Sequence, residues 1–85
     1  WLEVDLGAER RVGGVEIWEI GFARVRAFTV EVRQGESWLE VARGTAVKGR
    51  KKISFAPVTA RQVRLVIHEA SEVPTLEEFR VLAPE

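Results

Sequence analysis

The 85-residue sequence contains no cysteine, which excludes disulfide bonds and zinc sites built from thiolates. Secreted domains without disulfides are common, so this absence leaves the redox compartment open. Methionine is also missing, and the chain starts at Trp1 inside an apolar alternation, so we expect it to be part of a larger polypeptide. No apolar run approaches the ~20 residues that a membrane-spanning helix needs, and the strand-like start does not resemble a signal peptide.

The chain carries no net charge, but its charges are unevenly spread. Residues 1–40 carry eight acids and five bases, residues 41–64 seven bases and no acid, and residues 65–85 five acids and one base. Two interpretations stay open: basic strands pair with acidic neighbours across a sheet, or the basic block attracts an anionic partner such as a sulfated or uronic polysaccharide. In a chain without net charge, the basic run 48–52 does not indicate a nucleic-acid reader.

Apolar residues alternate with polar ones through most of the chain, a pattern that predicts β-strands. The alternation predicts seven short strands, with Gly7 and Pro57 ending two of them and a hairpin loop at 34–37. No segment has the 3.6-residue period of an amphipathic helix. We therefore expect residues 1–85 to form a single antiparallel β-sandwich or barrel. A chain this short buries only roughly 60–65% of the surface that its unfolded form exposes.

The core is expected to contain the large apolar residues on the inward side of these strands. They are Phe28, Trp38, Phe55, Val63, Leu65 and Ile67. Leu76 and Phe79 differ in parity, so burying both requires a β-bulge in the last strand.

The chain resembles the discoidin family in six segments that follow in the family's order: WLEVDLG, VGGVEIWE, ARVRAFTVEV, SWLEVARGT, KKISFAPVTARQVRLVI and TLEEFRV. This family is the C-type domain of blood-coagulation factors five and eight, found also as galactose-binding-like carbohydrate-binding modules. The chain is most similar to the C-terminal module of α-L-fucosidases. The resemblance implies an all-β, antiparallel jelly-roll β-sandwich whose loops at one end hold ligand. Two features depart from the family: the segment that usually precedes WLEVDLG is absent, and the loop between Glu19 and Arg24 is shorter.

A carbohydrate site pairs an aromatic face with side chains that hydrogen-bond hydroxyl groups. Trp18 lies on the polar side of its strand's alternation, and Phe22 lies where a loop tip is expected. The resemblance implies a ligand contact for Arg24, whereas Glu19 stands where fucose-binding lectins have an arginine. We therefore expect the site to consist of Trp18, Glu19, Phe22 and Arg24. The alternative is a Glu19–Arg24 ion pair with a purely structural role.

No catalytic residue is expected. His68 is the only histidine, its neighbour Glu69 points to the opposite face of a strand, and no G-x-S-x-G motif is present. The resemblance implies a structural calcium site to which Glu78 and the backbone carbonyl of Glu77 contribute. Since the other family ligands come from the absent N-terminal segment, this site would be partial, and no other cofactor is expected.

The sequence thus predicts a non-catalytic carbohydrate-binding accessory module of a glycoside hydrolase such as an α-L-fucosidase. Its partners would be glycans or the catalytic domain of the parent hydrolase. The alternative is a structural or protein-interaction β-sandwich without a sugar site. The resemblance implies an extracellular or periplasmic location. Without the N-terminal segment, an open strand edge is expected, and with it a dimer formed through that edge.

Overall fold

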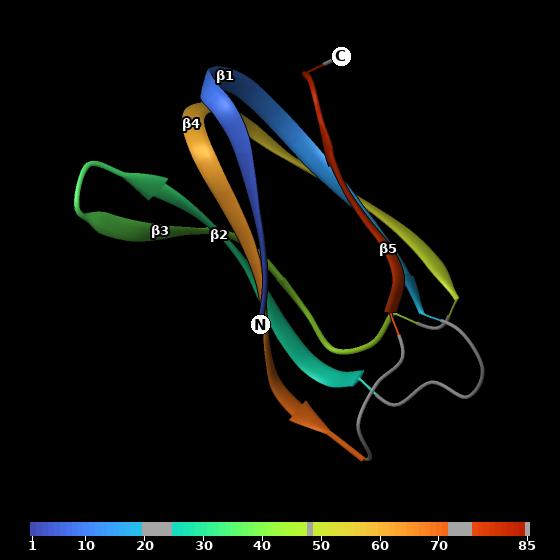
Figure 1. Ribbon diagram of the computed structural model, residues 1–85. Coiled ribbons are helices and arrows are strands. Elements are labelled where there is room, and N and C mark those ends of the chain that lie inside the picture. The colour runs from blue at the N-terminus through green and yellow to red at the C-terminus, as the bar shows by residue number, and fades with distance from the viewer. Residues whose placement is uncertain (20–24, 48, 72–75, 85) are drawn as a thin grey trace.

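The computed structural model describes residues 1–19, 25–47, 49–71 and 76–84 (Figure 1). It contains five strands: β1 (Leu2–Glu19), β2 (Val25–Gln34), β3 (Ser37–Gly44), β4 (Arg50–Ala70) and β5 (Leu76–Leu82). All strand pairs are antiparallel, in the order β3-β2-β4-β1-β5. No helix that could cross a membrane is found in the described residues. The predicted all-β antiparallel fold is confirmed.

The two longest strands, β1 and β4, run through both layers of the molecule. The start of β1 pairs with the second half of β4, in the register Leu2 with Leu65, and β2 and β3 continue this layer. The end of β1 pairs with the start of β4, in the register Trp18 with Arg50, and β5 completes the second layer. Figure 1 shows both long strands bending over at the top of the view, which folds one continuous sheet into a sandwich.

The prediction of seven short strands was wrong, because neither Gly7 nor Pro57 ends its strand. Both residues lie at irregularities in the pairing of β1 with β4. The register shifts between Asp5 and Arg10, around Gly7, and again between Val12 and Gly14, opposite Pro57. A bulge leaves residues out of the hydrogen-bond ladder, so it accommodates a proline without a backbone donor and a glycine with φ of 81°.

The core lies between the two layers and is built largely from β-branched residues. Phe28, Val63 and Leu65 are at most 1% exposed, as predicted, and Phe55 and Ile67 are half-buried against the core. The buried apolar residues are Val12, Val15, Ile17, Val25, Phe28, Val30, Val32, Val47, Ala60, Val63 and Leu65.

Trp38 was expected in the core and lies outside it. Its register partner is Arg33, which follows the buried Val32 along β2. Since successive residues of a strand point to opposite faces, Trp38 is on the face that turns away from the core. Its ring packs against Arg64, whose Cζ atom is 3.9 Å from the ring centroid.

The expected bulge in the last strand is present. Trp18 pairs with Glu78 and Glu19 pairs with Leu76, so one residue of β5 is left out of the register. This shift brings Leu76 and Phe79 to the same side despite their different parity, and both pack against the core.

Candidate functional site

Three segments meet at Glu19, where β1 ends. The backbone nitrogen of Glu19 donates a hydrogen bond to the carbonyl oxygen of Gly49, over 2.8 Å, in the connection between β3 and β4. Its carboxylate Oε2 accepts a hydrogen bond from the backbone nitrogen of Val25, over 3.2 Å, at the start of β2. Glu19 is only 2% exposed, so its carboxylate joins the strand ends from inside the protein.

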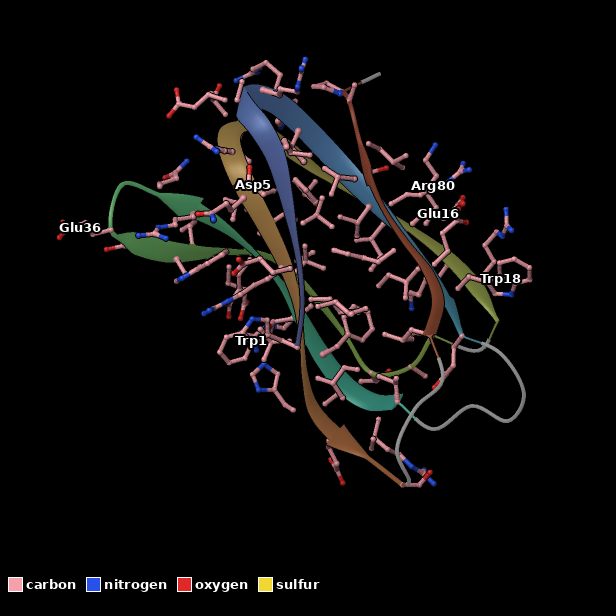
Figure 2. All side chains as sticks on the ribbon, viewed as in Figure 1. Trp1, Asp5, Glu16, Trp18, Glu36 and Arg80 are labelled. Atoms are coloured by element: carbon pink, nitrogen blue, oxygen red, sulfur yellow. The ribbon has the colours of Figure 1, made fainter. Side chains whose placement is uncertain are left out.

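Trp18 points the opposite way and is 36% exposed. The guanidinium of Arg50, its register partner on β4, lies over the indole with Cζ 4.6 Å from the ring centroid. Arg50 also faces Glu16, with 3.5 Å between Nη1 and Oε1. In Figure 2, Trp18 projects away from the core, on the same side of the molecule as Glu16. These three side chains present an aromatic ring, hydrogen-bond donors and a carboxylate together at the surface. We call them the Trp18 cluster.

Of the four predicted carbohydrate-binding residues, the structure describes Trp18 and Glu19 and places them on opposite faces of β1. Phe22 and Arg24 lie outside the described residues. The sequence did not identify Arg50 and Glu16 as neighbours of Trp18. Arg50 could have been identified from the antiparallel register of β1 and β4. That register cannot be predicted from the sequence without knowing where both strands bend.

Three arginines of the basic block of residues 41–64 pair with acidic residues of neighbouring strands, as one of the two open interpretations predicted. Arg50 faces Glu16 of β1, and Arg61 binds Asp5 of β1 with 2.9 Å between Nε and Oδ1. The hydrogen bond from Arg61, together with one from the backbone of Gly7, holds the pKa of Asp5 below its ordinary value.

Arg64 makes the least exposed of these pairs. Its Nη2 and Nε atoms lie 2.6 Å and 2.7 Å from Oε1 of Glu31 on β2. Its Cζ atom also lies over the rings of Trp1 and Trp38, at 5.1 Å and 3.9 Å from their centroids. Because Arg64 contacts a carboxylate and two indole rings, we assign it a role in stabilising this face of the sheet.

His68 forms a hydrogen bond with Thr29, with 2.8 Å between Nε2 and Oγ1. Thr29 Oγ1 also donates to Oε2 of Glu31, over 3.3 Å. The histidine therefore belongs to a polar network across β2 and β4. In the described residues the carboxylate of this network contacts Thr29 and not the imidazole, which is not the arrangement of a hydrolase triad.

Glu78 and its described neighbours do not by themselves make a calcium site, and the partial site that the resemblance implies stays a prediction. Oε1 of Glu78 accepts a hydrogen bond from Nε of Arg80 over 2.8 Å, so a cation already faces this carboxylate. The residues that the structure describes contain no group of three or more His, Cys, Asp or Glu side chains that could hold a metal ion. Calcium takes six to eight oxygen ligands, far more than Glu78 contributes.

Comparison with protein families identifies the class of domain. The family model for the NedA-like galactose-binding domain, of the F5/F8 type C group, matches residues 1–65. The chain therefore belongs to this family of galactose-binding-like domains. No curated protein sequence matches the chain.

Solved structures similar to this chain come from bacterial glycoside hydrolases. A Bacteroides thetaiotaomicron protein assigned as an α-L-fucosidase superposes with a TM-score of 0.95 at 27% identity, over 99% of this chain and 20% of that one. The Ruminococcus gnavus GH29 fucosidase, solved in complex with fucose, gives a TM-score of 0.83 at 26% identity, over 98% of this chain and 17% of that one. The chain thus spans about a fifth of the length of these fucosidases.

A third similar structure is a separate binding module. It is a variant of chitosan-binding module 1 from a Paenibacillus chitosanase/glucanase, with a TM-score of 0.81 and 26% identity over 93% of this chain and 64% of that module. The predicted resemblance to discoidin-type modules of glycoside hydrolases is confirmed.

Proposed function

We propose that the chain is a non-catalytic carbohydrate-binding accessory module of a glycoside hydrolase such as an α-L-fucosidase. Its ligands would be glycans, its parent catalytic domain would lie in another part of the same polypeptide, and its location would be extracellular or periplasmic. Support comes from its family and from its similarity to fucosidases and to a chitosan-binding module.

The Trp18 cluster is the observation that carries the proposal. A half-exposed indole offers an apolar surface on which the hydrogen-lined face of a pyranose can pack. Arg50 and Glu16 lie beside it and supply donors and acceptors for the hydroxyl groups of the same sugar. The buried Glu19 would act indirectly, by fixing the ends of β1 and β2 beside this surface.

The proposal is tested by NMR titration of the isolated chain with fucose, galactose and chitosan oligosaccharides. We expect chemical-shift changes at the Trp18 indole and at Arg50 at millimolar sugar. Trp18→Ala should weaken binding at least about fivefold, which corresponds to roughly 1 kcal/mol for the lost stacking contact.

Trp1→Ala is the matched control, because Trp1 is 77% exposed but belongs to the Arg64 stack rather than to the Trp18 cluster. It should leave the binding of neutral sugars unchanged. Absence of shifts at Trp18 and Arg50 with every sugar would instead favour a structural or protein-interaction β-sandwich without a sugar site. Equal losses in the two variants would also contradict the proposal.

A further inference from the structure

A second concave surface lies away from the Trp18 cluster, beside β2 where β3 ends. It is an open hollow of about 710 Å³, within the roughly 300–1,000 Å³ range of small-molecule sites. Its apolar surface comes from Ala27, Phe28 and Gly44. None of Trp18, Glu19 and Arg50 lines it, so it is separate from the candidate site described above.

Glycine is required at position 44 for the shape of this hollow. A Cβ atom added to Gly44 would lie 2.6 Å from the Cζ atom of the buried Phe28 ring. The ring therefore packs directly against the backbone of β3. Any side chain at position 44 would displace the ring.

The charged groups around the hollow favour an anion. Lys51 is half-buried there, its Nζ donates to the carbonyl oxygen of Ala46 over 3.2 Å, and it makes no ion pair within the part of the chain that the structure describes. Arg43 and Glu40 also line the hollow and pair with each other over 2.7 Å, while the Arg43 side chain stays 76% exposed. Since Glu40 compensates Arg43, the Lys51 charge is left without a compensating carboxylate among the described residues.

Hydroxyl and imidazole groups complete the lining. Thr29, His68 and Thr45 supply two hydroxyl groups and an imidazole, and the first two are already hydrogen-bonded to each other over 2.8 Å. This bond fixes the orientation of the imidazole, whose second ring nitrogen is not used by it. Together the walls offer an apolar surface, hydroxyl-binding groups and an excess of positive charge.

We propose that this hollow is a second carbohydrate site, which takes an acidic sugar unit such as a uronic acid. The sugar carboxylate lies near Lys51 and Arg43, where it compensates the lysine charge. The pyranose ring packs over Ala27 and the backbone of Gly44, and its hydroxyl groups meet His68 and Thr45. This ligand class differs from the neutral sugars assigned to the Trp18 cluster.

The experiment is an NMR titration of the isolated chain with D-galacturonic acid, with galactose as the neutral sugar of the same configuration. We expect galacturonic acid to shift the backbone amides of Thr29, Arg43, Thr45 and Lys51, and galactose to leave them unchanged. Binding should weaken as salt rises from low to physiological ionic strength, because the contact is partly electrostatic. Shifts by galacturonic acid confined to Trp18 and Arg50, or equal shifts by galactose at Lys51, would overturn the proposal.

Variants separate this site from general charge attraction. Lys51→Gln should weaken galacturonic acid binding about tenfold, the loss of one charge-assisted hydrogen bond. Arg11→Gln removes the same charge from an exposed position of β1 outside the hollow and should leave binding unchanged. Arg43→Gln is the second test, for the case that Lys51→Gln disturbs folding. It changes a mostly exposed side chain and should also weaken the binding of galacturonic acid. The proposal would be overturned if Arg43→Gln and Arg11→Gln bound galacturonic acid equally well. If galactose caused no shifts at Trp18, only the assignment of the Trp18 cluster would fail.

Discussion

Arg64 and Arg43 form the same kind of ion pair in different environments. The side chains of Arg64 and Glu31 are 20% and 17% exposed, and the guanidinium lies over two indole rings. Those of Arg43 and Glu40 are 76% and 37% exposed. Water screens the second pair and competes for its hydrogen bonds, so the two arginines should contribute unequally to stability.

We predict that Arg64→Ala lowers the free energy of unfolding by about 2–3 kcal/mol, because the half-buried Glu31 loses its hydrogen bond from Nε of Arg64 and its ion pair with Nη2. Arg43→Ala should cost less than ~1 kcal/mol. Urea unfolding of the two variants beside the parent chain measures the difference. Comparable losses would show that the indoles and the reduced exposure add nothing to the Arg64 pair.

At the scale of strands, Glu19 connects the end of β1 to the start of β2 and to the β3–β4 connection. We predict that Glu19→Ala lowers the free energy of unfolding by about 1–3 kcal/mol, because the buried backbone nitrogen of Val25 loses its acceptor. Amide exchange of Val25 should accelerate with it. Glu19→Gln keeps a side-chain oxygen for this bond, so the amide of Val25 should exchange more slowly in Glu19→Gln than in Glu19→Ala. Unchanged Val25 exchange in Glu19→Ala would contradict the assigned role.

The strands also show which features can be predicted from sequence. Alternation correctly identified the β-class, the inward faces of Phe28 and Leu65, and the bulge near Phe79, because these depend on local parity. It failed at Gly7 and Pro57, since a bulge and a strand end have the same local sequence signals. It also failed for Trp38 and for the Trp18–Arg50 stack, because both depend on the register between strands distant in sequence.

Among the described residues, the sandwich as a whole leaves one edge of its first strand unpaired. Leu2–Asp5 pairs with β4 on one side, whereas the pairing of β1 with β5 begins only at Gly14. The other edge of Leu2–Asp5 therefore carries no strand among the described residues. A hollow of about 270 Å³ lies beside it, lined in part by Leu2, Val4 and Phe79, and Leu2 is 42% exposed. An unpaired edge next to apolar surface favours the addition of another strand.

We predict that two copies of the isolated chain associate through this edge, since antiparallel pairing of identical strands satisfies both edges at once. Sedimentation velocity should show a dimer whose fraction rises with protein concentration. Leu2→Lys places a charge on the edge and should shift the protein to monomer. Leu39→Lys is the matched control, because Leu39 is 45% exposed on β3, at the opposite edge of the sheet, and it should leave the dimer intact. A monomer at all concentrations, or equal effects of the two lysines, would contradict association through this edge.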